Sequence, residues 1–103
     1  MRYATYQATT ALGEGDGAAL DGTLATRGEC LVVETDDGSV VVPVLPASAT
    51  TWDGGAERLT IGSSEYRVGD RVSFGGGYSG RAPDVEIPSA CADLGEHFLV
   101  STP

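Results

Sequence analysis

Apolar and polar residues alternate with a period of two along most of the chain, which is the pattern of half-buried β-strands. In residues 20–26, for example, Leu20 and Leu24 fall on one face and polar residues lie between them. No segment has the pattern of a helix with three or more turns. The pattern predicts strands over residues 20–26, 30–35, 39–45, 58–61, 65–68, 71–74 and 97–101, a candidate first strand over residues 2–9 and a short candidate strand over residues 85–87.

Turn residues separate these segments. The Asp37-Gly38 pair is a strong hairpin signal between two apolar runs, and "GSS" at residues 62–64 predicts a second tight hairpin. Because proline cannot donate a hydrogen bond to a β-ladder, Pro43 is expected at a sheet edge or a bulge. Residues 46–55 are predicted to form a longer loop around Trp52.

One short helical turn is compatible with residues 88–94. Pro88 suits the first turn of a helix and Gly95 suits the position after its end.

Many short strands with little helix predict an all-β fold, a small β-barrel of five to eight strands. The 103 residues have the length of one domain, with an N-terminal strand and glycine-rich loop over residues 1–19 and the barrel over residues 20–101. Closure into a barrel would remove exposed edge strands.

Five segments carry a resemblance to the OB-fold, a five-stranded Greek-key barrel. They are "LDGTLAT", "CLVVET", "SVVVPVL", "GDRVSFGGG" and "EHFLVS", which span residues 20–101. The hairpin "ERLTIGSSEYRV" stands where many OB-folds carry a helix. The "CLVV" strand, the "GDRVSFGGG" turn and the "PSAC" segment are also similar to small secreted or lipid-anchored proteins of GC-rich bacteria, most of which have no assigned function.

Fifteen acidic and six basic residues give the chain a net charge of −9 and a pI near 4.2. All basic residues are arginines, and lysine and asparagine are absent, which suggests a GC-rich genome or, alternatively, the acidic surface of a halophile. The lack of a basic cluster argues against nucleic acid and against anionic membranes as partners. The longest apolar run, residues 40–47, contains two prolines and is too short to span a membrane.

The first residues lack the apolar core of a signal peptide, so the expected location is the cytoplasm or, if a signal has been removed, outside it.

The segment "FGGGYSGRAPD" at residues 74–84 contains G-x-G-x-x-G, and "GEGDGA" at residues 13–18 comes close to it. A dinucleotide site needs a helix directly after these glycines. No helix is predicted after the glycines of residues 74–84. At residues 13–18, the carboxylates of Glu14 and Asp16 would repel phosphate. We therefore interpret Gly75 to Gly77 as a bulge that ends a strand, and we expect no cofactor.

Cys30 and Cys91 are a candidate disulfide, and two buried free thiols are the alternative. Their spacing with His97 is not that of a zinc site, and the acidic turns lack the order of an EF-hand, so no metal is expected. His97 is the one histidine in the chain. A hydrolase would need it beside a serine or cysteine nucleophile, which no motif supplies. No catalytic residue is assigned, and hydrolase-like chemistry at His97 is kept only as an alternative.

Two aromatic residues, Trp52 and Tyr78, fall on predicted loops, where a large ring either packs over a barrel end or meets a partner. Arg81 and Asp84 follow Tyr78 closely, so the four residues form the candidate binding set. We expect a non-enzymatic binding or interaction module that contacts a protein or peptide through loops at the barrel rim. A small-ligand or saccharide binder that uses Trp52 and Tyr78 is the alternative.

Overall fold

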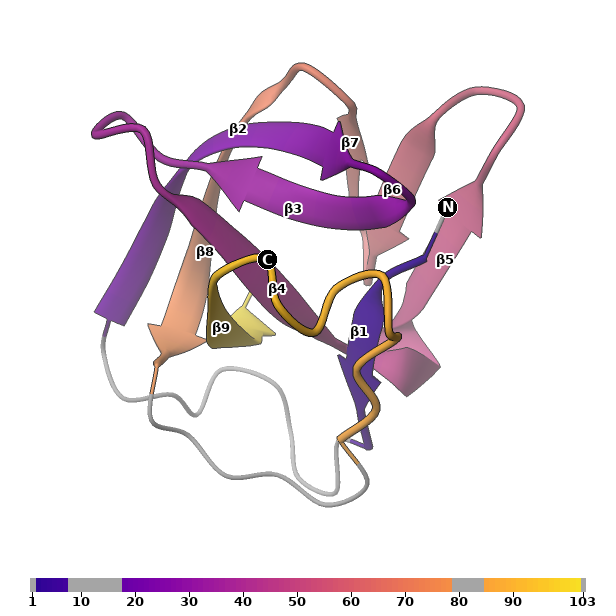
Figure 1. The fold of residues 1–103 in the computed structure, drawn as a ribbon. Coiled ribbons are helices and arrows are strands. Elements are labelled where there is room, and N and C mark those ends of the chain that lie inside the picture. Colours follow the sequence, from indigo (N-terminus) through magenta and orange to yellow (C-terminus); the bar gives the residue numbers. More distant parts are fainter. Residues whose placement is uncertain (1, 8–17, 79–84, 103) are drawn as a thin grey trace.

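The computed structural model describes residues 2–7, 18–78 and 85–102, which form β-strands and one 3-10 turn (Figure 1). The described elements are β1 (Ala4–Tyr6), β2 (Ala18–Arg27), β3 (Cys30–Glu34), β4 (Val40–Pro46), η1 (Ala47–Ala49), β5 (Thr50–Asp53), β6 (Arg58–Ile61), β7 (Ser64–Arg67), β8 (Arg71–Gly77) and β9 (Glu96–Thr102). Among these residues, no helix has the length and apolarity of a membrane span.

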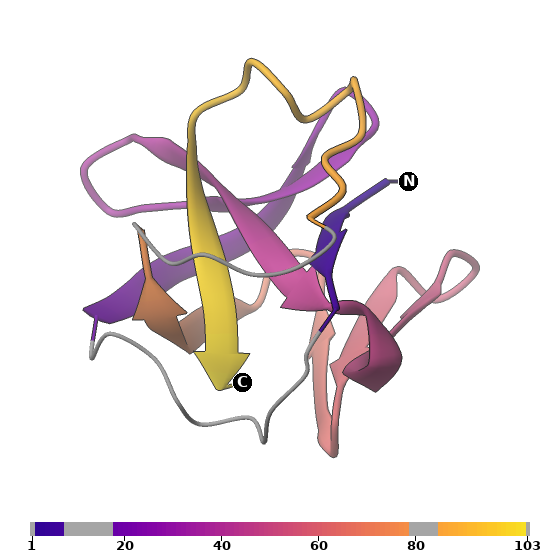
Figure 2. The same ribbon diagram turned by 90° about the horizontal axis from the view of Figure 1, so that it is seen from below.

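Five strands close into a barrel. Each strand pairs with the next in the order β2, β3, β4, β9 and β8, and β8 pairs with β2 to complete the ring. β4 and β9 run parallel and side by side (Figure 2), whereas the other four pairs are antiparallel. The predicted all-β barrel is confirmed, and its closed five-stranded form is compatible with an OB-like fold.

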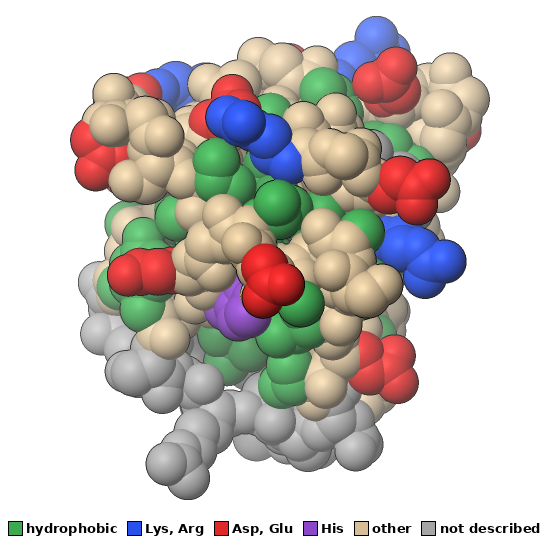
Figure 3. Space-filling model, in the orientation of Figure 1, with side chains coloured by type: hydrophobic (Ala, Val, Ile, Leu, Met, Phe, Trp, Pro, Cys, Tyr) green, Lys and Arg blue, Asp and Glu red, His purple; other side chains and the backbone are tan. Residues whose placement is uncertain are grey.

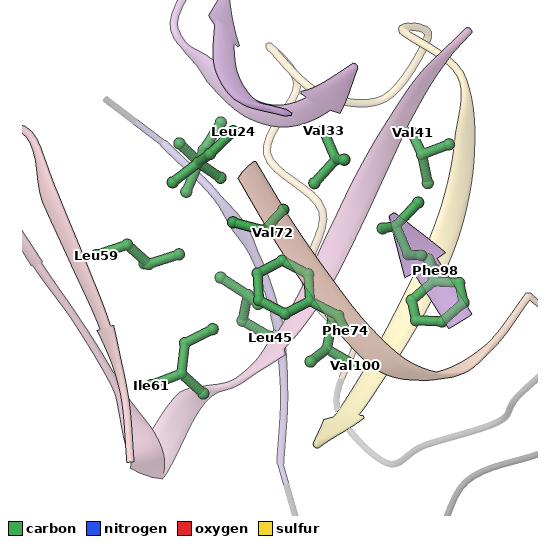
Figure 4. Close-up of a cluster of buried hydrophobic side chains, with 12 residues drawn as sticks. Leu24, Val33, Val41, Leu45, Leu59, Ile61, Val72, Phe74, Phe98 and Val100 are labelled. Atoms are coloured by element: carbon green, nitrogen blue, oxygen red, sulfur yellow. The ribbon is translucent and has the colours of Figure 1, made fainter. Parts of the chain in front are cut away.

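The barrel interior is filled partly from a second, three-stranded sheet. This sheet consists of β5, β6 and β7 and stands between β4 and β8 in the chain. Leu59 and Ile61 of β6 point into the same buried cluster as Leu45 and Phe74 of the barrel (Figure 4). The Tyr66 ring meets the Phe74 ring edge-on, with centroids 5.4 Å apart. The hairpin predicted over residues 57–68 is therefore part of the core.

The prediction of a loop over residues 46–55 is wrong. The 3-10 turn η1 and strand β5 lie within it, and Trp52 of β5 pairs with Leu59 of β6. Flanking proline and glycine residues suggested a loop, but a β-branched and aromatic run paired with a neighbouring strand outweighs them. Residues 88–94 form successive turns instead of a helical turn, and residues 85–87 contribute only an isolated bridge at Glu86.

An outer layer covers one side of the barrel. It comprises β1 and residues 85–95, and it packs on the outward-facing side chains of β3 and β4. β1 runs parallel to β4, and the main-chain N–H groups of Thr5 and Glu86 donate to each other's carbonyls at 2.9 and 2.8 Å. Cys91 of this layer forms a disulfide with Cys30 of β3, and their Cα atoms are 5.3 Å apart. The disulfide fastens the layer to the barrel wall.

β4 is consequently buried on both faces. Val41 and Leu45 join the barrel core, whereas Val42 and Val44 join the cluster beneath the outer layer. The expectation that Pro43 marks an edge or bulge is wrong, because it lies in the middle of β4 opposite Phe98. On the other side of β4, the ladder with β3 ends before this point and the ladder with β1 begins after it. A missing N–H group is tolerated in such a gap.

The expected bulge in the glycine segment is confirmed, but it does not end the strand, because β8 continues to Gly77. The register between β8 and β9 shifts between Gly75 and Gly76. A Cβ atom at Gly76 would lie 1.8 Å from the carbonyl oxygen of Leu99, so no larger residue fits there. Gly80, and Gly13 and Gly15 of the other glycine segment, lie outside the described residues.

Removal of the disulfide should destabilise the protein strongly. The bond closes a loop of 61 residues, and on the chain-entropy model such a loop contributes about 4 kcal/mol. The double variant Cys30→Ala/Cys91→Ala should lose about this much free energy of unfolding in guanidinium titrations. As a control, the denatured wild-type protein should show no free thiol before reduction; two titratable thiols there would contradict the disulfide.

Tyr6 should contribute stability that is lost in alkali. Its buried hydroxyl donates to the carbonyl of Val100 at 2.7 Å, and burial raises the pKa of this phenol. Because the folded pKa lies above the unfolded one, the contribution is complete below about pH 10 and falls as the pH rises through the folded pKa. Tyr6→Phe should lower the free energy of unfolding at neutral pH by about 1–3 kcal/mol and flatten its alkaline decline.

Tyr3→Phe provides the matched control for this measurement, because Tyr3 is only partly buried against the barrel core. The two variants are compared by urea unfolding across the alkaline range. An alkaline decline as steep in Tyr6→Phe as in the wild type would show that another group causes it.

Candidate functional site

Tyr78 stands where β8 ends, and it is the centre of the candidate site. Its ring meets the ring of Phe98 edge-on, with centroids 4.9 Å apart and planes at 81°. Phe98 is fully buried, yet Tyr78 remains 47% exposed, so a rigid core residue supports an exposed aromatic ring. Among the described residues, Tyr78 and Val85 are the large apolar side chains that remain exposed.

An apolar hollow of about 240 Å³ opens on one side of Tyr78 and is called the His97 hollow here. It is lined by Val44, Tyr78, Val85, Ile87, His97 and Leu99. Val44 and Leu99 face each other across the parallel β4–β9 ladder, so this ladder contributes to its walls. The space-filling view shows the histidine at the surface, beside hydrophobic side chains and an acidic one (Figure 3).

His97 brings one unpaired polar atom into this apolar setting. Its Nε2 atom is buried and has no hydrogen-bond partner among the residues that the structure describes. His97 lies on β9 opposite Val42 of β4, and it alternates with the inward-facing Phe98 and Val100, so it turns toward the outer layer. A buried polar atom without a partner is rare in native proteins and destabilises the fold by about 1–3 kcal/mol.

A second hollow of about 560 Å³ also borders Tyr78 and is called the acidic hollow. It is lined by Thr35, Asp37, Ser39, Val40, Val41, Tyr78, Leu94, Gly95 and Glu96. Gly95 is required in its wall because a Cβ atom there would lie 2.0 Å from the carbonyl oxygen of Val40. The carboxylates of Asp37 and Glu96 make this hollow attractive to cations.

Asp37 is held in position as an anion. Its Oδ1 atom accepts hydrogen bonds from the hydroxyl of Thr35 and from the main-chain N–H of Ser39 (3.0 Å). These bonds lower the pKa of the Asp37 carboxyl below its usual value, and the bond from Thr35 has the largest effect. The carboxylate therefore stays charged well into the acidic range and keeps one orientation.

The neighbouring Asp36 points to a different partner. Both of its carboxylate oxygens accept from the Arg71 guanidinium at 2.7 Å, and this bidentate pair lowers the Asp36 pKa. Both side chains are exposed, so the pair adds little stability, but it joins the turn between β3 and β4 to the start of β8. The described residues contain no cluster of three potential metal ligands.

The structure does not unite the four residues of the predicted binding set. Tyr78 borders both hollows, whereas Trp52 lies on β5, packs against the barrel core and lines neither hollow. Its packing agrees with the alternative in which this ring closes part of the barrel. Arg81 and Asp84 lie outside the described residues.

The sequence offers His97 only as a catalytic residue or a metal ligand and does not reveal Val85, Ile87 and Leu99 as its neighbours. Alternation in "HFLV" places His97 and Leu99 on one face and Phe98 and Val100 on the other. This signal shows that His97 points out of the barrel, but it cannot show that the outer layer then encloses it.

Comparison of the chain with protein-family models, with curated proteins and with solved structures finds no match. The site is therefore interpreted from its own geometry.

Replacement of His97 by an apolar residue should stabilise the fold. His97→Leu removes the unpaired buried nitrogen and adds apolar contact, so the free energy of unfolding should rise by about 1 kcal/mol. His97→Gln, which keeps a polar group at this position, should show no such gain. Urea titrations of both variants at neutral pH test this, and a loss of stability in His97→Leu comparable to the expected gain would contradict it.

Proposed function

We propose that this protein is a non-enzymatic binding module that recognises a partner protein or peptide through the surface around Tyr78. The observation that carries the proposal is the half-exposed Tyr78 ring, fixed by Phe98 between an apolar and an acidic hollow. Tyrosine is enriched at the centres of protein interfaces, because a rigid ring buries much area at little cost in conformational entropy.

Charge indicates which partner fits. Asp37 and Glu96 line the acidic hollow, and exposed Glu86 and Asp93 lie on the outer layer beside the apolar side chains. The whole chain carries a net charge of −9. A segment with arginine or lysine next to an apolar side chain complements this surface, and long-range attraction would speed its association at low salt.

Two observations support a binding role rather than catalysis. Among the described residues, no serine, cysteine or carboxylate pairs with Nε2 of His97, whereas a hydrolase would need such a pairing. Both cysteines are in the disulfide and are not available as nucleophiles. Binding at one side of the rim is also how OB-like barrels work.

The disulfide further supports a working location in an oxidising compartment, where such bonds persist. This agrees with the resemblance to small secreted or lipid-anchored proteins of GC-rich bacteria.

A small polar ligand such as a saccharide is the second candidate. The acidic hollow favours it, because about 560 Å³ is within the range of about 300–1,000 Å³ that is common for small-molecule sites. Trp52 has no part in this version, since it does not line the hollow.

Selection from a library of random displayed peptides tests the main proposal. Peptides that bind the wild-type protein at low salt should combine a basic residue with an apolar or aromatic one. Tyr78→Ala should weaken their binding at least about tenfold, which is the effect of losing a central interface side chain. Added salt should weaken binding as well.

Thr51→Ala is the matched control, because Thr51 is exposed on β5 and lines neither hollow. Circular dichroism and thermal unfolding would verify that both variants are folded. If no peptide is enriched, or if enriched peptides bind Tyr78→Ala as tightly as the wild type, the proposed surface is wrong.

A further inference from the structure

The His97 hollow has room for one side chain. Its volume of about 240 Å³ is below the range of about 300–1,000 Å³ that accommodates drug-sized molecules. Apart from His97, its lining consists of aliphatic side chains and the Tyr78 ring. Tyr78 and Val85, which line the hollow, are each more than 40% exposed, so the hollow borders the surface. These features suit the insertion of a single apolar group.

The unpaired nitrogen adds a polar requirement. In a neutral imidazole, Nε2 either donates or accepts a hydrogen bond, depending on the tautomer. A hydroxyl group can do both, so it pairs with Nε2 in either case. An ammonium can only donate and a carboxylate can only accept. The best occupant is therefore apolar along its length and carries a hydroxyl at its tip.

The surrounding charge excludes anionic versions of this group. Glu86 and Glu96 are exposed and directly adjoin the hollow residues Ile87 and His97 in the chain. A phosphate or carboxylate brought there would meet like charge. An unmodified phenol satisfies all three conditions, of size, polarity and charge.

We propose that the His97 hollow is a specificity pocket for one unmodified tyrosine side chain of the partner, whose phenolic hydroxyl pairs with Nε2 of His97 after the imidazole ring turns to expose this buried atom. This inference rests on the proposed function, because the tyrosine belongs to a partner that docks on the Tyr78 surface. It also explains why a polar residue occupies an apolar position at a cost to stability: the nitrogen finds its partner only in the complex.

The probes that test it are p-cresol, which is the side chain of tyrosine, and toluene, which lacks the hydroxyl. Each is titrated into the isotope-labelled, oxidised protein, and the imidazole nitrogens are followed by NMR. The signals need no assignment, because the chain has one histidine. We expect saturable p-cresol binding that shifts Nε2, and toluene binding that is about tenfold weaker.

Two variants separate the hydrogen bond from the shape of the hollow. In His97→Leu the preference for p-cresol over toluene should disappear, whereas His97→Gln should retain part of it, because glutamine can also donate or accept. Thermal unfolding verifies that both variants are folded, and the Nε2 shift in the wild type supplies a result that needs no variant.

The inference is overturned if the wild type binds both probes equally, if His97→Leu keeps the preference, or if neither probe gives a saturable shift at His97. None of these results bears on the outcome of the peptide selection. Peptides that lose affinity in Tyr78→Ala but not in His97→Leu would keep the proposed function and reject the tyrosine pocket. Conversely, p-cresol binding without any enriched peptide would leave a pocket for a phenol and reject the peptide-binding surface.

Discussion

The burial of β4 on both faces is the constraint on which the rest of the structure depends. A five-stranded barrel this small encloses one face of each strand and leaves the other to solvent unless something covers it. Along β4, Val41 and Leu45 fill the inside, but Val42 and Val44 are equally apolar and face outward. The outer layer covers these two side chains, and the Cys30–Cys91 disulfide holds residues 85–95 of this layer on the barrel.

The candidate site forms where this cover ends. The outer layer lies against the β4–β9 ladder. At the border of this layer, Val85 and Ile87 line the hollow together with His97. Beyond the bulge at Gly76, β8 still pairs with β9 as far as Gly77, and Tyr78 follows directly, with its ring against Phe98. The core, the disulfide and the proposed binding surface are therefore parts of one arrangement, in which His97 occupies an apolar position at a cost to stability.

Much of the barrel could be predicted from the sequence, because strand alternation and the Asp37-Gly38 turn are local signals. β5 was missed because the prolines and glycines around it outweighed its short β-branched run. The hollow could not be predicted, since it joins residues from β4, β9 and the outer layer that only the parallel closure brings together. The sequence groups Trp52 with Tyr78 because it predicts loops at both positions, but strand pairing places Trp52 on β5.

Amide hydrogen exchange of the oxidised and the reduced protein tests most directly the claim that the disulfide holds the outer layer on the barrel. The account predicts that reduction accelerates exchange at Thr5 and Glu86, which are hydrogen-bonded to each other, and at the amide of Cys91. The β2–β8 ladder should keep most of its protection, because it lies outside the cover. Protection that falls equally in both regions, or an outer layer that stays protected after reduction, would contradict the account.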